Sequence, residues 1–259
     1  MRVIAVVEAT ALALLTPVTL PIQAVAQPIP PPTASRPTPV RTVLASAGLP
    51  SVGDVPLHFK LLRVSVAAGQ STQYVGSNGF VWGLSGVLTL TTDEESRTLR
   101  SGDAAFIGAG KRASLKSTGG DAAVFLHFLL VAAGDLGRSA ESEPATVTEL
   151  YRTATPIPGL KPGAYEFSLT RVTLPPRTPI NPPHYRSGGA LYYVAAGTGA
   201  FTTGGRTEPR PAGVWHYEPY GMVHQWANPG DLPLVLLQAN ISPEGTPVVI
   251  FGTPPEAPK

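Results

Sequence analysis

An internal duplication restricts the fold of this chain more than any other feature of its sequence. Three glycines of the first half recur at one constant spacing of 111 residues, as the pairs Gly86 and Gly197, Gly102 and Gly213, and Gly110 and Gly221. Glycine suits tight turns, so a constant spacing of turn glycines indicates two copies of one structural unit. Short apolar runs separated by such turns fill both copies, and no long segment has the 3.6-residue period of a helix. The sequence therefore predicts two similar β domains in tandem.

The composition agrees with an all-β protein that has many turns. Apolar residues make up 43% of the 259 residues and charged residues only 14%, and the chain contains 27 glycines and 29 prolines. A formal net charge of +2 is too small to indicate a nucleic-acid partner or binding to an anionic membrane surface. A nucleic-acid partner is therefore not expected.

Residues 1–26 have the pattern of a secretory signal peptide. Arg2 supplies the positive end, residues 11–15 the apolar centre, and residues 24–26 a cleavage site after Ala26. The apolar run is too short and too interrupted by proline for a membrane span. We expect export to a periplasm or to the medium. The absence of cysteine does not identify the compartment.

The rest of the chain divides by composition into five segments. They are a proline-rich, disordered tether at 27–56, a first β domain at 57–131, a linker at 132–163, a second β domain at 164–250 and a flexible tail at 251–259. Within the linker, residues 145–153 are expected to form one short helix. Acidic residues come early in that stretch and an arginine comes late, as the helix dipole prefers.

Residues 213–228 predict a strand, a tight turn and a second strand. Pro219 fixes φ and Gly221 permits positive φ, so the chain reverses there, and His224 comes early in the next strand. The spacing Gly-x5-Pro-x-Gly-x2-His-x3-Asn matches the second motif of the cupin family at every defined position. The chain thus resembles a cupin and, with its duplication, a bicupin. That resemblance implies two tandem double-stranded β-helix (jelly-roll) barrels.

In metal-binding cupins, a first motif supplies two histidines and a glutamate, which join the histidine of the second motif around one cation. In the second copy His184 matches the first histidine, Arg186 stands at the second, and Ala190 stands where the glutamate is expected. With His224, two of the four family ligands are present. The resemblance implies a site for one divalent transition metal, iron, manganese or zinc, with an altered ligand set.

Side-chain alternation along the strand before the turn bears on the missing ligands. His216 and Glu218 lie on one face of this strand, and Trp215 and Tyr217 lie on the other. If the first face points into the barrel, His216 and Glu218 complete a metal site with the two histidines above. If the second face is the buried one, His216 and Glu218 are solvated.

Arg186 supports a different interpretation. A guanidinium is always charged, so it repels a divalent cation, but it binds a carboxylate or phosphate through a bidentate fork. Arg186 is expected to hold an anionic substrate, unless it lies at the rim and pairs with solvent. Tyr192 is expected to act with Arg186 on the substrate, and the pocket walls are expected to be Tyr185, Trp226 and Gln238.

The first copy has none of the family ligands. Gln73, Val75 and Gly79 occupy the positions of the first motif, and Ala113 replaces the histidine of the second. This barrel is expected to be structural or to form a homodimer. His127, on its last strand, is expected to be a hydrogen-bonded interior side chain.

Two functions from different classes remain open. The first is a metal-dependent enzyme acting on a small oxygenated or anionic compound, of the dioxygenase, decarboxylase or isomerase type known in the family. The second is a metal-free protein that binds a small anionic ligand without catalysis. No nucleophile elbow, phosphate loop or dinucleotide fingerprint competes with these two.

Overall fold

The computed structural model describes residues 38–52, 55–138, 141–252 and 254. In this part of the chain the secondary structure is nineteen β-strands and one short 3-10 helix, η1 (Ala133–Asp135). None of its helical structure has the length and apolar character needed to cross a bilayer. The predicted all-β fold with two tandem barrels is confirmed. The predicted signal peptide, residues 1–26, lies outside the described residues.

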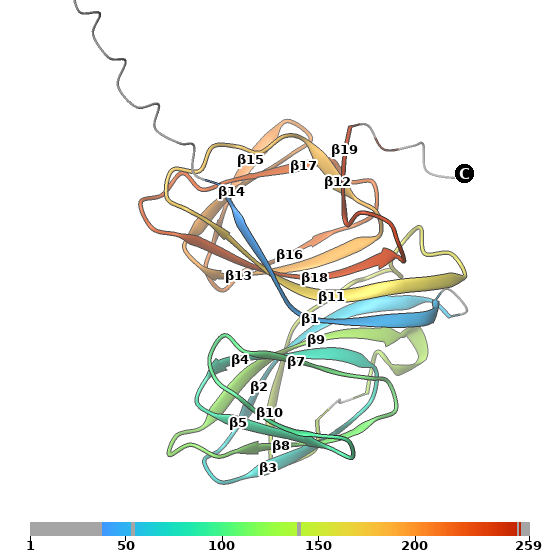
Figure 1. Cartoon of the computed structure of the whole chain (residues 1–259), viewed down its shortest axis with the longest axis vertical. Helices are drawn as coiled ribbons and strands as arrows, with labels where there is room; N and C mark the ends of the chain where they lie inside the picture. Colours follow the sequence, from blue (N-terminus) through green and yellow to red (C-terminus); the bar gives the residue numbers. More distant parts are fainter. Residues whose placement is uncertain (1–37, 53–54, 139–140, 253, 255–259) are drawn as a thin grey trace, which may run out of the picture. The chain divides into compact units, whose positions relative to one another are not determined.

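The second barrel is built from two five-stranded sheets (Figure 1). In spatial order, the strands of one sheet are β1 (Val40–Val52), β11 (Gly163–Leu174), β18 (Leu234–Pro243), β13 (Gly189–Ala196) and β16 (Trp215–Glu218). Those of the other sheet are β15 (Arg206–Pro211), β14 (Thr198–Thr203), β17 (His224–Ala227), β12 (His184–Arg186) and β19 (Val249–Phe251). Phe251 thus belongs to a strand, although the sequence placed it in a tail.

The first barrel has the same plan with one strand fewer. One sheet contains β10 (Thr146–Arg152), β2 (Leu57–Val66), β9 (Ala123–Ala132), β4 (Asn78–Ser85) and β7 (Ala104–Ile107). The other contains β3 (Ser71–Val75), β8 (Arg112–Ser117), β5 (Leu88–Thr92) and β6 (Ser96–Leu99). All strand pairs are antiparallel.

The paired glycines explain why the two copies fold alike. Each pair has the same positive φ: 73° and 78° at Gly86 and Gly197, 90° and 90° at Gly102 and Gly213, and 74° and 75° at Gly110 and Gly221. Residues with a Cβ rarely adopt this region. The constant spacing in the sequence therefore marks equivalent turns that require glycine.

The two copies exchange their leading strands. Strand β1 precedes the first barrel in sequence but pairs with β11 of the second, as Figure 1 shows, and β10 pairs with β2 of the first. The predicted tether is therefore wrong over Val40–Val52. The predicted helix is also wrong, because Thr146–Arg152 is a strand. Threonine, valine and tyrosine favour extended structure, and the open edge of β2 supplies the backbone partners.

A shared apolar cluster joins the exchanged strands to both barrels. The Phe80 and Phe167 rings, from β4 and β11, have centroids 4.5 Å apart, and Phe59 of β2 lies 6.5 Å from Phe167. Leu49 and Val52 of β1 are buried in the same cluster. Each barrel also has its own interior cluster. The side chains that build the candidate site come from the interior of the second barrel.

The turn after β17 depends on Asn228, which is 1% exposed. Its amide nitrogen donates to the carbonyl oxygens of Leu174, Pro175 and Leu232 at 3.0, 3.0 and 2.9 Å, and its oxygen accepts from Gly230. The asparagine of the motif therefore holds the end of β11 and the turn before β18 together through hydrogen bonds.

Replacing Asn228 with alanine is expected to lower the free energy of unfolding by about 1–3 kcal/mol, because buried carbonyl groups lose their donor. Chemical denaturation followed by circular dichroism measures this change. Asn78→Ala is the matched control, since its side-chain oxygen caps only the exposed amide of Ala109. Equal effects of the two substitutions would contradict the locking role of Asn228.

Candidate functional site

The interior of the second barrel gathers polar side chains that the strand register places together. His184 lies opposite His224, and Tyr192 lies opposite both His216 and Gln238. The site residues that are at most 3% exposed are His184, Arg186, Tyr192, Glu218, His224, Trp226 and Gln238. Buried polar groups are costly unless they have partners, so this concentration marks a site.

The strand before the turn presents His216 and Glu218 to the interior. The His216 ring centroid lies 4.0 Å from that of Phe201, and Glu218 is 0% exposed. On the other face Trp215 is 38% exposed, and the Tyr217 ring lies 5.9 Å from Phe59 of the first barrel. The inward orientation is therefore the correct one of the two alternatives.

Glu218 is the centre of the polar network. Its Oε2 accepts from Nε of Arg186 at 3.0 Å, and its Oε1 accepts from Nε1 of Trp226 at 3.1 Å. Burial alone would raise the pKa of Glu218, but the charge of Arg186 and the contacts with His224 and Trp226 lower it to about 2. The carboxylate is ionised at neutral pH and fully engaged.

Arg186 lies inside the barrel and not at its rim. It is 1% exposed, and its Nη2 donates to the hydroxyl of Tyr192. Its Nη1 is buried and has no hydrogen-bond partner. The interpretation of Arg186 as a solvated rim residue is wrong, and one donor of its guanidinium remains available.

Two backbone carbonyls orient the histidines. Nδ1 of His184 lies 3.0 Å from the oxygen of Pro182, and Nδ1 of His224 lies 2.9 Å from that of Met222. A carbonyl can only accept, so each Nδ1 carries the proton and each Nε2 faces the interior. Nε2 of His224 lies 3.0 Å from Oε2 of Glu218, and this contact is an ion pair when the imidazole carries a proton on both nitrogens.

The missing glutamate of the family motif has a replacement on the neighbouring strand. Ala190, at the position of that glutamate, lies directly opposite Glu218. Both residues are fully buried, and the small side chain of Ala190 leaves room for the carboxylate. The interior thus contains three histidines, His184, His216 and His224, and one carboxylate, although the carboxylate comes from β16 instead of β13.

This donor set nevertheless does not fit a metal ion. In the described part of the chain, no three His, Cys, Asp or Glu side chains are arranged to hold one. Both oxygens of Glu218 are already engaged by Arg186 and Trp226. A cation at Glu218 would also lie beside the buried guanidinium, which repels it. The arrangement suits an anion better than a cation.

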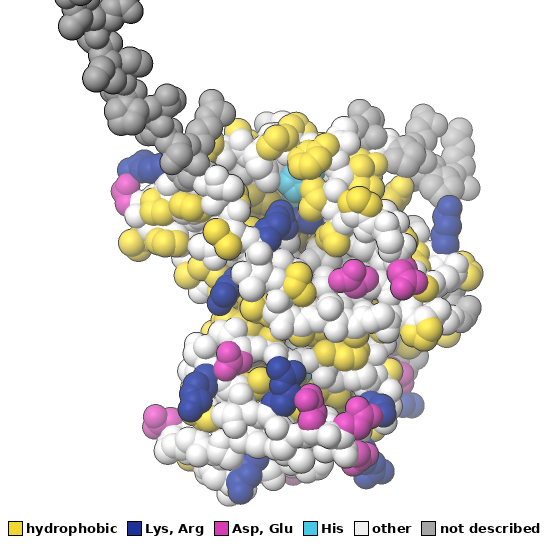
Figure 2. Space-filling view, viewed as in Figure 1, with side chains coloured by type: hydrophobic (Ala, Val, Ile, Leu, Met, Phe, Trp, Pro, Cys, Tyr) yellow, Lys and Arg dark blue, Asp and Glu magenta, His cyan; other side chains and the backbone are white. Residues whose placement is uncertain are grey.

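The exchanged strand β1 reaches this site. A cavity of about 30 Å³ is lined by side chains of the second barrel together with Pro39 and Arg41. Nη1 of Arg41 donates to Oε1 of Gln238 at 3.3 Å. Arg41 could not be predicted as a site residue, because the composition of its segment indicates a tether. A histidine and basic side chains gather in a hollow over the second barrel (Figure 2).

Most of the predicted pocket residues line this interior, but Tyr185 does not. His184 and Arg186 flank Tyr185 on β12 and point inward, so its side chain points to the opposite face. Its ring lies 6.3 Å from that of Tyr220. Tyr192 and Trp226 stack at 5.7 Å inside the barrel, and Gln238 is 2% exposed.

The strand register of the first barrel shows that the predicted alignment of the two copies is wrong by one residue at β3. Tyr74 lies opposite Ala113 just as His184 lies opposite His224, so Tyr74 is the counterpart of His184. Gln73 and Val75, predicted for the ligand positions, are exposed. Tyr74 precedes the turn glycine Gly86 by 12 positions, whereas His184 precedes Gly197 by 13, so the spacing of the two copies shifts by one here.

His127 is an interior side chain with a partner, as predicted. Its Nδ1 forms an ion pair with Glu141, and both side chains are fully buried. The Tyr74 ring lies 4.6 Å from the imidazole. Glu141 was missed, because it belongs to the linker and its neighbours in the sequence do not indicate a strand.

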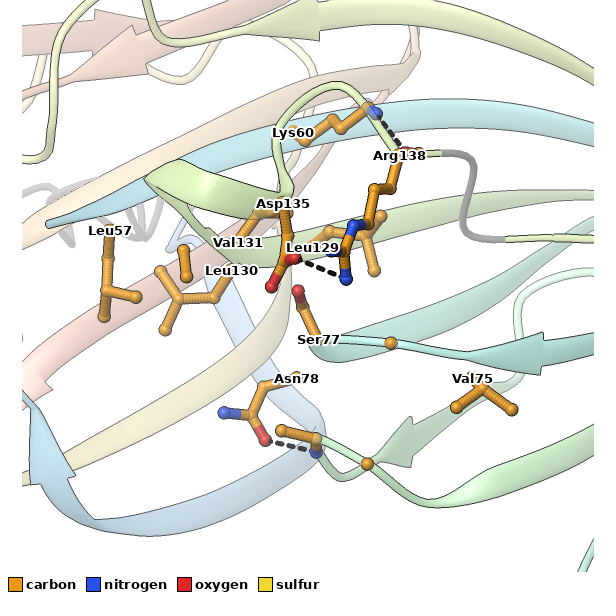
Figure 3. Close-up of a pocket in the computed structure, with 14 residues that line it drawn as sticks. Leu57, Lys60, Val75, Ser77, Asn78, Leu129, Leu130, Val131, Asp135 and Arg138 are labelled. Carbon is orange, nitrogen blue, oxygen red and sulfur yellow. Dashed lines mark hydrogen bonds and ion pairs between the residues drawn. The ribbon is translucent and has the colours of Figure 1, made fainter. Parts of the chain in front are cut away.

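A larger cavity, about 420 Å³, lies at the first barrel, between the end of β9, η1 and the start of β4 (Figure 3). Its charged groups have partners: Arg138 pairs with Asp135 at 3.0 Å, and Nζ of Lys60 donates to two backbone carbonyls. None of the described side chains that line it is a buried polar group without a partner. We therefore place the candidate site in the second barrel, despite the smaller cavity there.

Acid is expected to destabilise the second barrel. Burial is the main cause that lowers the pKa of His184 and of His216 to about 4, from an ordinary value of 6.5. The unfolded chain therefore takes up protons at a higher pH, so stability is full above pH 6.5 and is lost as the pH falls towards 4. The melting temperature should fall across this window, and less steeply in His216→Phe. An identical slope in that variant would contradict the assignment.

Comparisons with known proteins agree with the fold. A model of the cupin domain family matches residues 170–240. A single-residue variant of oxalate decarboxylase from Bacillus subtilis superposes with a TM-score of 0.53 at 14% identity, covering 76% of this chain and 71% of that one. AerE from Microcystis aeruginosa superposes with a TM-score of 0.51 at 16% identity, covering 79% and 97%. The search of curated proteins gave no match.

Proposed function

Since the chain belongs to the cupin superfamily, we propose that its second barrel binds a small carboxylate-bearing compound without a metal ion. One observation carries the proposal: Nη1 of Arg186 is buried without a partner inside the barrel. An unmade hydrogen bond from a buried charged group costs more than one from a neutral group. A carboxylate oxygen is the acceptor that best satisfies this guanidinium donor.

The size and lining of the site narrow the class of ligand. The cavity is small, about 30 Å³, so its buried end suits a compact polar group. The stacked rings of Tyr192 and Trp226 provide an apolar wall beside that group. We infer a ligand with a carboxylate at the buried end and a short remainder towards the mouth of the cavity.

A metal-dependent enzyme is the second candidate, and one observation favours it. Histidines that bind metals usually donate their other ring N–H to a carbonyl or carboxylate, as His184 and His224 do here. His216 adds a third interior imidazole, but no three of these side chains are arranged around one point in the described part of the chain, and Arg186 stands beside them. We therefore rank this candidate below metal-free binding.

Calorimetric titration of the chain with formate, acetate and oxalate tests the proposal. The chain is purified without chelators and kept in a buffer free of carboxylates. The acids are expected to bind, whereas formamide and acetamide, which lack the charge, are not. Tyr192→Phe should weaken binding, because it removes the hydroxyl that positions Arg186, whereas Arg171→Gln, on the opposite face of β11, should not. Absence of binding, or equal binding of acids and amides, would overturn the proposal.

Elemental analysis of the same preparation decides between the two candidates. About one equivalent of iron, manganese or zinc, lost in His224→Ala, would replace carboxylate binding with the metal-dependent enzyme. A chain that takes up none of these metals when they are offered supports metal-free binding. Export, suggested by residues 1–26, and a homodimer of barrels also remain proposals.

A further inference from the structure

The exchanged strand β1 brings a second guanidinium to the mouth of the site. Arg41 lies opposite Val172 of β11, whose side chain belongs to the interior cluster of the second barrel. Much of the Arg41 side chain is exposed, but its Nη1 reaches the buried amide of Gln238 at 3.3 Å. The inner end of this side chain is partly buried, which lowers the pKa of Arg41, whereas the charge of Glu218 raises it.

The charged side chains Arg41, Arg186 and Glu218 together give the site a net positive charge. Arg186 and Glu218 form a buried ion pair at 3.0 Å and cancel each other. In the described part of the chain, no carboxylate lies within ion-pair distance, 4.0 Å, of Arg41, and its hydrogen-bond partner is the neutral Gln238. A positive charge near a low-dielectric interior attracts an anion strongly. The surplus charge is thus supplied by β1 and not by the barrel itself.

We propose that Arg41 is the second anion-binding residue of this site and determines its preference for compact carboxylates. The ligand carboxylate replaces Gln238 as the acceptor for Arg41 and receives the free Nη1 donor of Arg186 on its inner side. This inference rests on the proposed function, because it assigns a further residue to the same site. A neutral ligand of the same shape gains nothing from either guanidinium.

The first barrel provides an internal comparison. In its exchanged strand, Val147 lies opposite Val64, at the register position that Arg41 has opposite Val172. The first barrel therefore receives an apolar side chain where the second receives a cation. This difference agrees with a ligand site in only one of the two copies.

Affinity for oxalate and acetate, measured by calorimetry on the full chain, tests the role of Arg41. Loss of one charge-assisted contact is expected to raise the Kd of Arg41→Gln by about tenfold to a hundredfold. Arg41→Lys keeps the charge and should lose less. Arg171→Gln removes an arginine from the opposite face of the adjacent strand and should bind like the unmodified chain. Circular dichroism and melting temperature confirm that each variant is folded.

The outcomes separate this inference from the proposed function. If the unmodified chain binds acids and Tyr192→Phe weakens that binding, but Arg41→Gln keeps the original Kd, then the Arg41 assignment is overturned and the proposed function stands. If Arg41→Gln and Arg171→Gln weaken binding equally, net charge and not a site contact is responsible, and the assignment again fails. If the unmodified chain binds no carboxylate, both proposals fall.

Discussion

Replacing Arg186 with methionine is expected to lower the free energy of unfolding by about 3–5 kcal/mol. The substitution removes the cation from a buried ion pair and leaves the Glu218 carboxylate, which is 0% exposed, without its charge partner. Methionine fills much of the same volume, so the loss reports the uncompensated charge. Chemical denaturation followed by circular dichroism or tryptophan fluorescence measures the change.

A second variant separates charge from packing in this prediction. The double substitution Arg186→Met with Glu218→Gln removes both charges and should recover most of the lost stability, because replacing both members of a buried pair is often close to neutral. Arg171→Met, at a half-buried arginine without a charged partner among the described residues, is the matched control and should change stability less. If the double variant is no more stable than Arg186→Met, packing and not the buried charge controls the stability.

Replacing Phe167 with alanine is expected to cost about 3–5 kcal/mol of stability, by leaving a cavity in the shared apolar cluster. The ring is 0% exposed and contacts Phe80 and Phe59 of the first barrel. Thermal unfolding should show a lower melting temperature and broader, less cooperative unfolding, because the barrels lose part of their common core. Phe251→Ala, at a ring that is 66% exposed, is the control and should have a small effect. A stable, fully cooperative Phe167→Ala protein would contradict the role of the shared cluster.

Turn residues were the most predictable part of this fold. Positive φ requires glycine at each repeated turn, so the spacing of these glycines predicts the duplication and with it the two barrels. The two motif histidines, His184 and His224, could also be assigned from the sequence, and the structure places them opposite each other on β12 and β17.

Residues whose place depends on long-range pairing could not be predicted. Thr146–Arg152 has acidic residues and an arginine where a helix would have them, but the open edge of β2 makes it a strand. Arg41 joins the site only because β1 pairs with β11, and no local pattern indicates that exchange. The inward direction of Glu218 was open, because the buried face of an isolated strand cannot be chosen when both faces are partly apolar.

The exchange of leading strands delays the pairing of β1 while the protein is synthesised. Strand β1 leaves the ribosome early, but its partner β11 begins only at Gly163, after the whole first barrel has been synthesised. During that interval β1 presents an unpaired edge, with Val40 and Val43 exposed even in the finished fold. Until the second half emerges, nascent chains can pair with one another through this edge. A chain that ends before β11 would therefore lack the second barrel and would also keep β1 as an unpaired strand that can pair with another chain.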